Sequence, residues 1–455
     1  MLTTADIQVA LDRLVKGGAS FGELFLEDRT DEEVRYQGSN PEAVQRLRIY
    51  GVGLRLIGPE HQVIYTYSSD ASAAGILRLA EEGLEMLGSA KGASDKVLLS
   101  SKQCFGSKEG RSASADVAAA AKEAAGLATT IAVPLISQRI TCTVVNQRVT
   151  IANTEGLWAE EERNSSRVRL NYTLGDEKSS VYEWVDYSET QPFSKWNAAA
   201  FHAHIKEQLT GTYRVLKAEP LPAMRLPVVL AAGGCGTLWH ECCGHGLEAP
   251  GIADGSSPYA GLLGQVVASP KVTLIDDGTM PGLYGTAALD DEGNRTRANV
   301  LIEKGVLKNY LCDRVSADKL GLEANGCCRR QDYTFVPTAR MSNTYLAPGS
   351  DDEEEMIRSL GEGLYVKRLG GGSGGAIFSL AVTEAYLIRN GQIDRPVKNC
   401  MLSGSGLDVM KKIDRVGSKL VSEYGSFCGA ASGLVPVTSF QPQVRISEMV
   451  LGGQK

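Results

Sequence analysis

The sequence predicts an α+β fold with two parts: an N-terminal domain of helices layered on a sheet, and a β-rich C-terminal domain that contains one short helix with two histidines. Three observations lead to this prediction. Before residue 217, segments with helical periodicity are interspersed with segments in which apolar and polar residues alternate. Residues 219–222, Glu-Pro-Leu-Pro, have the composition of a linker. After them, strand patterns dominate. We therefore expect two domains, residues 1–222 and residues 223–455.

The N-terminal domain is expected to begin with an amphipathic helix over residues 4–16. Apolar residues from Ile7 to Leu14 recur there at helical spacing, and Thr3 or Thr4 can cap the first turn. The patterns that follow predict strands at residues 21–27, 34–37, 46–57 and 63–67, a helix at 71–87, a loop at 89–112, a helix at 115–132, strands at 140–151, 167–174 and 179–185, and a helix at 196–216.

The C-terminal domain is expected to consist mainly of strands. The apolar runs predict strands at residues 227–232, 272–275, 299–303, 306–311, 377–388 and 400–402, and a helix at 238–245. Asn390-Gly391 predicts a hairpin turn. The acidic run 351–355 is expected in the first turn of a helix, where acids favour the helix dipole. The glycine run 370–375 lacks the lysine of a phosphate loop, so we interpret it as closely approachable backbone beside an extended peptide.

Composition excludes several classes of protein. The chain has 455 residues, 43% of them hydrophobic and 22% charged, as in soluble globular proteins. The net charge of −7 argues against nucleic acid as the main partner, because no basic surplus is available to neutralise phosphates. No long apolar run suggests a membrane span, and the N-terminus lacks a signal-peptide pattern. We therefore expect a cytoplasmic protein whose ten cysteines are reduced.

One segment combines residues typical of a metal site. His240 and His245 are two of the five histidines in the chain, and Glu241 follows the first of them. Two imidazoles can bind a metal while a neighbouring carboxylate acts on water. On a regular α-helix, however, residues five apart differ by about 140° and do not share a face. Either these histidines are ordinary helix-end residues beside Gly244, or the helix is distorted near that glycine, for example by a π-bulge.

A catalytic zinc site needs a third protein ligand. The sequence alone leaves this ligand open. Glu248 is close to the two histidines but follows the motif directly. Cys242 and Cys243 lie between the two histidines, so either would have to bind the metal from the same short segment. The remaining histidines, His61, His202 and His204, all belong to the first domain, and the last two are read as surface or packing residues because they are two positions apart.

The sequence from His240 to Glu248 resembles the metal-binding helix of the TldD/PmbA family of peptidases. The resemblance covers nearly the whole chain. Further similar blocks are residues 22–29 and 51–55 in the first domain, and residues 290–293, 299–307, 329–331, 340–345, 384–388 and 428–442 in the second. The departures are the Cys242-Cys243 pair, where small apolar residues are expected, and the unusually glycine-rich run 370–375.

The resemblance implies a zinc peptidase. It implies that His240, His245 and Cys428 bind Zn²⁺ and that Glu241 is the general base. Members of the PmbA type lack this motif, so the chain is similar to the TldD type. The family further implies a heterodimer with a PmbA-type paralogue and a closed cavity that admits unfolded peptides. Two alternatives are a non-catalytic scaffold or regulatory subunit, and a thiol-dependent enzyme that uses Cys242 or Cys243.

Overall fold

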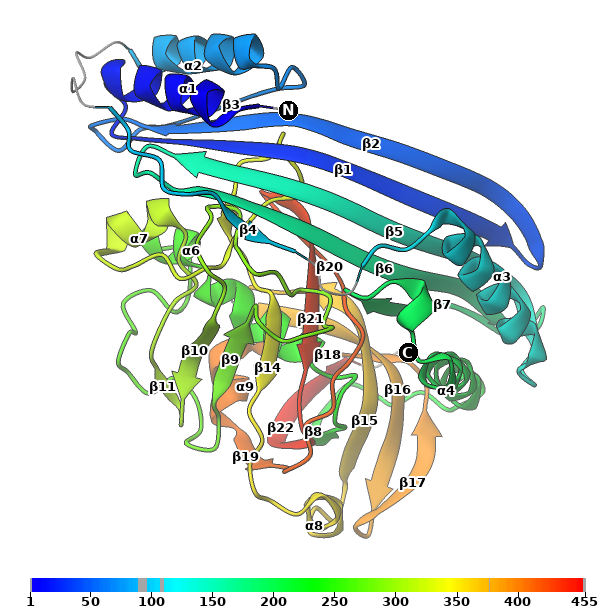
Figure 1. The fold of residues 1–455 in the computed structure, drawn as a ribbon. Helices are drawn as coiled ribbons and strands as arrows, with labels where there is room; N and C mark the ends of the chain where they lie inside the picture. Colours follow the sequence, from blue (N-terminus) through cyan, green and yellow to red (C-terminus); the bar gives the residue numbers. More distant parts are fainter. Residues whose placement is uncertain (1, 89–95, 107–109, 376, 453–455) are drawn as a thin grey trace.

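This computed structural model describes residues 2–88, 96–106, 110–375 and 377–452. A sheet of long strands lies across a β-rich C-terminal half, and helices lie at both ends of this sheet (Figure 1). The predicted α+β fold is therefore confirmed. No helix in the described part of the chain is both long enough and apolar enough to span a membrane.

The N-terminal sheet has seven strands among the described residues, in the order β3-β2-β1-β5-β6-β4, with β7 beside β6. The strands are β1 (Phe21–Gln37), β2 (Asn40–Ile57), β3 (Val63–Ser68), β4 (Gln103–Phe105), β5 (Leu135–Asn153), β6 (Trp158–Gly175) and β7 (Ser180–Glu189). The two strands predicted at residues 21–27 and 34–37 are one continuous strand, so that prediction was wrong. The predicted loop 89–112 contains β4; residues 89–95 and 107–109 lie outside the described residues.

Four helices pack on this sheet in the described part of the chain: α1 (Thr4–Lys16), α2 (Ala73–Leu87), α3 (Ser114–Thr130) and α4 (Ala198–Leu216). All four confirm the helices predicted from periodicity. Of the two candidate caps, Thr3 caps the first helix, because its side chain accepts a hydrogen bond from the amide of Asp6. In Figure 1, α1 and α2 cover one end of the sheet on the face that is turned away from the C-terminal half.

The C-terminal half contains two larger sheets. Its strands are β8 (Met224–Leu230), β9 (Leu274–Asp277), β10 (Ala298–Glu303), β11 (Val306–Leu307), β12 (Cys328–Arg329), β13 (Thr338–Ala339), β14 (Asn343–Leu346), β15 (Gly363–Ser373), β16 (Ile377–Arg389), β17 (Gln392–Val397), β18 (Cys400–Ser405), β19 (Ile413–Val416), β20 (Ser426–Ala430), β21 (Gly433–Phe440) and β22 (Val444–Gly452). One sheet has the order β11-β10-β9-β14-β21-β20. In the other, pairing of β15 with β16 closes a ring through β8, β22 and β18.

The helices of the C-terminal half are short. They are α5 (Thr237–Trp239), α6 (Ala249–Ala253), α7 (Arg314–Leu320), α8 (Glu353–Arg358) and α9 (Gly406–Lys411). The acidic run begins α8 as predicted, and Asp352 caps it by accepting a hydrogen bond from the amide of Glu355. The predicted hairpin joins β16 to β17, with positive φ at both Asn390 and Gly391.

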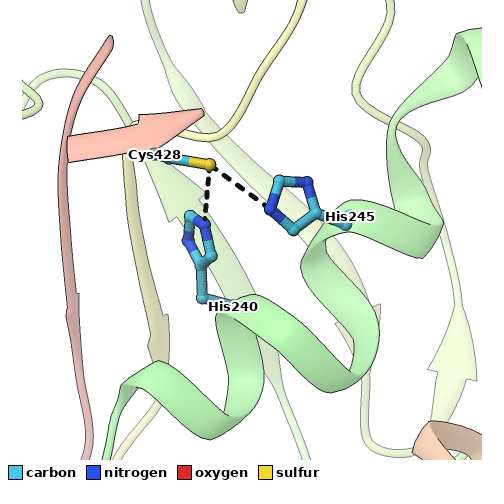
Figure 2. A group of neighbouring side chains, drawn as sticks. All are labelled: His240, His245 and Cys428. Carbon is cyan, nitrogen blue, oxygen red and sulfur yellow. Dashed lines mark hydrogen bonds between the residues drawn. The ribbon is translucent and has the colours of Figure 1, made fainter. Parts of the chain in front are cut away.

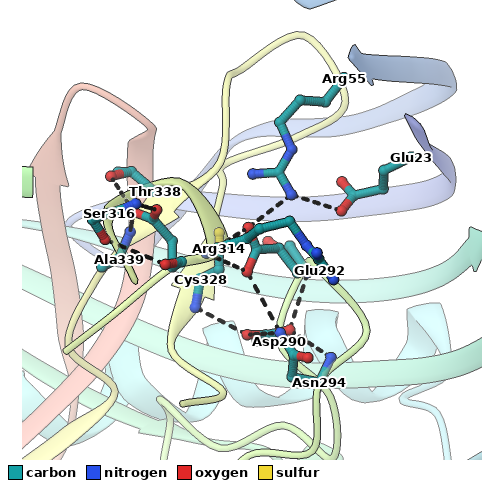
Figure 3. Close-up of polar contacts among 12 residues, drawn as sticks. Glu23, Arg55, Asp290, Glu292, Asn294, Arg314, Ser316, Cys328, Thr338 and Ala339 are labelled. Atoms are coloured by element: carbon teal, nitrogen blue, oxygen red, sulfur yellow. Dashed lines mark hydrogen bonds and ion pairs between the residues drawn. The ribbon is translucent and has the colours of Figure 1, made fainter. Parts of the chain in front are cut away.

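Buried charges join the two halves of the molecule (Figure 3). Arg55 of β2 is fully buried and lies 2.8 Å from Glu23 of β1 and 2.7 Å from Glu292 of the C-terminal half. Glu23 also lies 2.9 Å from Arg330, and the carboxylate of Glu292 accepts hydrogen bonds from the amide of Arg314. A buried ion pair needs such additional partners to offset the loss of hydration. These contacts hold the N-terminal sheet over the half that carries the two histidines.

Candidate metal centre

The segment with the two histidines is a distorted helix. It begins as α5, widens into a π-helix over His240–Gly244, and ends as a 3₁₀ turn over His245–Leu247. The amide of His245 donates to the carbonyl of His240, five residues earlier, which is the π-helical hydrogen bond. This wide turn places the two imidazole rings 4.8 Å apart, centroid to centroid. The distortion expected from the five-residue spacing is therefore confirmed.

The reason for a glycine at position 244 differs from the one predicted. Gly244 has φ −54° and ψ −54°, which any residue adopts, so the distortion does not depend on glycine's freedom at unusual backbone angles. A Cβ at this position would instead lie 2.0 Å from the sulfur of Met341. Glycine therefore leaves room for the side chain of Met341 against the π-helix.

Core packing anchors this helix. Leu238, Trp239, Cys242 and Cys243 are all buried, and the thiol of Cys243 donates to the carbonyl of Trp239 over 3.1 Å. Burial raises the pKa of Cys242 well above that of a free thiol. Buried thiols out of reach of solvent are poor nucleophiles, so Cys242 and Cys243 act here as small apolar residues.

Cys428 completes a cluster of atoms that could bind a metal ion. It lies on β20, close to the end of the chain, and its sulfur is 3.1 Å from Nε2 of His240 and 3.3 Å from Nε2 of His245. Figure 2 shows both rings turned toward this sulfur. The ligand atoms of the three residues all lie within 4.8 Å of one another. The fold thus brings together His240, His245 and Cys428, the three residues that the resemblance singles out.

This donor set fits a zinc ion. Tetrahedral zinc holds its nitrogen and sulfur ligands roughly 3.6 Å apart, only slightly more than the distances found here. Burial and the positive charges of His245 and Arg340 lower the pKa of His240, so its ring is neutral and can bind a metal. Burial also opposes protonation of His245, but Cys428 and Glu248 raise its pKa to about 10, so a metal must displace a proton there.

Glu241 is placed beside these ligands without being one of them. Its side chain lines the same cavity, and its carboxylate makes no hydrogen bond to any described residue. Burial raises the pKa of this carboxyl, against the opposing effect of His245. A carboxylate with a raised pKa and free oxygens can accept a proton from water.

A cavity of about 720 Å³ opens in front of the cluster. Both halves of the molecule line it. The C-terminal half contributes the histidines, Glu241, Cys428 and the glycine run, and the N-terminal half contributes Arg169, Glu183, Trp184, Asp186, His204 and Gln208. His204 was interpreted as a surface or packing residue, and its place in this wall was not predicted. It reaches the cavity because α4 packs beside β7, where His204 Nε2 hydrogen-bonds the carbonyl of Asp186.

The remaining candidates take no part in the cluster. His61 is exposed and pairs with Asp318, and His202 pairs with Glu123 on the surface. Glu248, considered as a third ligand, faces the other nitrogen of His245: its Oε2 lies 3.1 Å from Nδ1. This contact makes Glu248 a partner of a ligand rather than a ligand itself.

Comparison with known proteins places the chain in a family. Family models described as PmbA/TldA metallopeptidase domain 1, central domain and C-terminal domain match residues 22–87, 90–209 and 223–453. A metalloprotease TldD homologue of Buchnera aphidicola is 37% identical over 63% of this chain and 57% of its own length. Another, of Haemophilus influenzae, is 41% identical over 52% of this chain and 50% of its own length. The chain thus spans about half the length of these curated relatives.

Solved structures share the fold. TldE of Thermococcus kodakarensis superposes with a TM-score of 0.74 at 16% identity, over 98% of this chain and all of that one. A putative modulator of a DNA gyrase from Thermotoga maritima superposes with a TM-score of 0.76 at 19% identity, over 99% of this chain and all of that one. At these identities the likeness concerns the fold alone. The three matching family models cover most of the sequence, and the chain therefore belongs to the PmbA/TldD metallopeptidase family.

Proposed function

We propose that this chain is a zinc-dependent peptidase that hydrolyses unfolded peptides, with Zn²⁺ bound by His240, His245 and Cys428. The observation that carries the proposal is the convergence of two imidazole nitrogens and one thiol sulfur within 4.8 Å, from segments 183 positions apart in the sequence. Nothing in the packing of an ordinary core requires these three polar groups to meet. The metalloprotease names of relatives, one of them a zinc metalloprotease TldD homologue, support the same reading.

Glu241 is assigned the role of general base. Zinc, when bound, lowers the pKa of water and polarises a scissile carbonyl. The carboxylate of Glu241, whose pKa burial raises, takes the proton of the attacking water and returns it to the leaving amine. Cleavage then needs no nucleophile from the protein, which agrees with the burial of Cys242 and Cys243.

The substrate is proposed to bind as an added strand. From Gly370 to Ser373, β15 pairs with β16 on one side only, because its parallel partner β8 ends beside Val366. The free edge of β15 lines the cavity together with Glu241. An extended peptide can hydrogen-bond to such an edge through its main chain, with little dependence on sequence. A folded substrate has no extended segment free to do so.

The TldD-type identity implies a PmbA-type paralogue as the second subunit, and we keep this heterodimer as part of the proposal. A cytoplasmic location is proposed as well, since all ten cysteines are free in the structure. The alternative is a non-catalytic scaffold or regulatory subunit of such a complex. Zinc content separates the two: purified protein that holds well under one zinc per chain would favour the scaffold.

The decisive experiment measures zinc and cleavage of an unfolded peptide, for the chain alone and mixed with the paralogue. Glu241→Gln should retain zinc and lose cleavage, whereas Cys428→Ala should lose both. Retention of full activity by Glu241→Gln would refute the base assignment. A variant with alanine at both Cys242 and Cys243 is the control for a thiol mechanism, and it should stay active and sensitive to chelators.

A further inference from the structure

A fully buried arginine holds the strand that carries Cys428. Arg340 has no exposed surface, and one of its terminal nitrogens donates to the carbonyl of Cys428 over 2.7 Å. The other donates to the hydroxyl of Ser432 over 2.9 Å and to the carbonyl of Gly433 over 3.0 Å. These acceptors all belong to the hairpin of β20 and β21. The guanidinium therefore fixes the main chain at the residue that supplies the sulfur.

The same guanidinium faces the histidine side of the cluster. Its Nε lies 3.7 Å from Oε1 of Glu248, and among the described residues neither of these two buried atoms has a hydrogen-bond partner. The other oxygen of Glu248 contacts Nδ1 of His245. A continuous path of polar contacts thus runs from His245 through Glu248 and Arg340 to Cys428, and it connects two segments that are far apart in the sequence.

The two histidines differ in the hydrogen-bond partner of Nδ1. Glu248 can accept a hydrogen bond from Nδ1 of His245, so the ring is oriented with Nε2 facing Cys428. Nδ1 of His240 is buried and has no hydrogen-bond partner in the described part of the chain, so no carboxylate orients that ring from the side away from Cys428. The contacts of Glu248 and Arg340 therefore orient His245 and Cys428 but not His240.

A purely structural role is the simpler explanation for a buried arginine. An arginine cannot lose its charge in a protein, so any buried guanidinium collects several acceptors and a carboxylate. Arg340 differs from a generic case in its choice of partners. One is the carbonyl of a ligand residue itself, and another is the carboxylate that contacts a second ligand.

We propose that Arg340 and Glu248 are positioning residues: they hold the sulfur of Cys428 and the ring of His245 where both can bind the metal. This inference rests on the proposed zinc site. Removing the path should leave the ligands present but poorly placed. We therefore expect metal affinity to fall by about 10- to 100-fold in Glu248→Ala and in Arg340→Met, the size typical of lost partners of metal ligands. Glu248→Gln keeps an acceptor for His245 and should recover much of this loss.

The test uses the full chain. Zinc affinity is measured by competition with a chromophoric chelator, and cobalt is substituted so that its thiolate charge-transfer absorption reports on Cys428. In Arg340→Met this absorption per bound cobalt should decrease, because the sulfur is displaced from the metal. A second comparison repeats Arg340→Met in a Cys428→Ser background, where its effect on affinity should shrink if Arg340 acts through the cysteine.

Arg445 provides a matched control. Its side chain is also largely buried, and it pairs with Asp414 through two hydrogen bonds of 2.9 Å, between β19 and β22. Neither residue lines the cavity. Arg445→Met removes a partly buried ion pair without touching the path, so zinc affinity should change by no more than about twofold.

The outcomes separate this inference from the proposed function. Wild-type affinity and cobalt absorption in both Glu248→Ala and Arg340→Met would overturn the inference and leave the zinc site intact. An equal loss of affinity in the native and Cys428→Ser backgrounds would also overturn it, because that is the result of general unfolding. If Arg340→Met does not fold, Arg340→Lys and Glu248→Ala decide the question. Wild-type protein that binds no zinc would refute the proposed function itself.

Discussion

A single methyl group at position 374 tests the placement of the general base. Gly374 follows β15, and a Cβ there would lie 2.5 Å from the carbonyl oxygen of Glu241 and 2.6 Å from Oε2 of its carboxylate. Optimal contacts between nonbonded heavy atoms are about 3.5 Å, so Gly374→Ala must displace Glu241, or the backbone beside it, by about 1 Å. The three nearest atoms all belong to Glu241 and none to a proposed metal ligand.

A misplacement of about 1 Å at a reacting group can lower the rate by about 100-fold. We expect Gly374→Ala to lose kcat by that order of magnitude while zinc content stays at the wild-type level. Steady-state cleavage of an unfolded peptide and metal analysis of the same sample measure the two quantities. The control is Gly371→Ala in the same run, where the added methyl would only touch the Trp184 ring at 3.8 Å and could at most alter KM. Equal kcat for the two variants would refute the assignment of Glu241.

Three other perturbations have defined outcomes. Gly244→Ala should weaken zinc binding because its methyl collides with Met341, and Met341→Ala should restore part of the affinity by chelator competition. Arg55→Met removes the buried cation beside Glu292 and leaves Arg330 as the ion-pair partner of Glu23, and it should lower the free energy of unfolding by about 3–5 kcal/mol in denaturant titration. Burial raises the pKa of Glu27 from 4.5 to about 7. The folded state therefore binds a proton more tightly than the unfolded state, and the free energy of unfolding falls as the pH rises from about 4.5 to about 7. Glu27→Gln keeps a neutral side chain, and its unfolding free energy relative to wild type should therefore rise by about 3 kcal/mol between about pH 4.5 and about pH 8.

Local patterns in the sequence predicted helices better than strands. The helices α1 to α4 each carry a one-sided apolar stripe, so their periodicity survives in the sequence. In β15 the run from Gly370 to Gly372 has no side chains, and the alternation that marks a strand disappears. In β22 an irregularity between Ile446 and Met449 shifts the phase of the apolar residues. The domain boundary between residues 222 and 223 stays a prediction.

The candidate site was predictable only in part from local sequence. The spacing of His240 and His245 implied a distorted helix, because a regular turn cannot align them. No local pattern marks Cys428, since the sheet that brings β20 to the helix depends on pairing between distant segments. Resemblance to a family supplied that residue. Arg340 carried no signal of its own, because an arginine in a sequence gives no indication of whether it is buried.

The two halves of the molecule contribute different residues to the cavity. The proposed metal ligands and Glu241 all come from the C-terminal half, whereas Glu183, Trp184 and His204 line the cavity from the N-terminal half. None of these three wall residues belongs to the cluster of His240, His245 and Cys428. Substitutions in the wall can therefore change which peptides fit without moving the ligands.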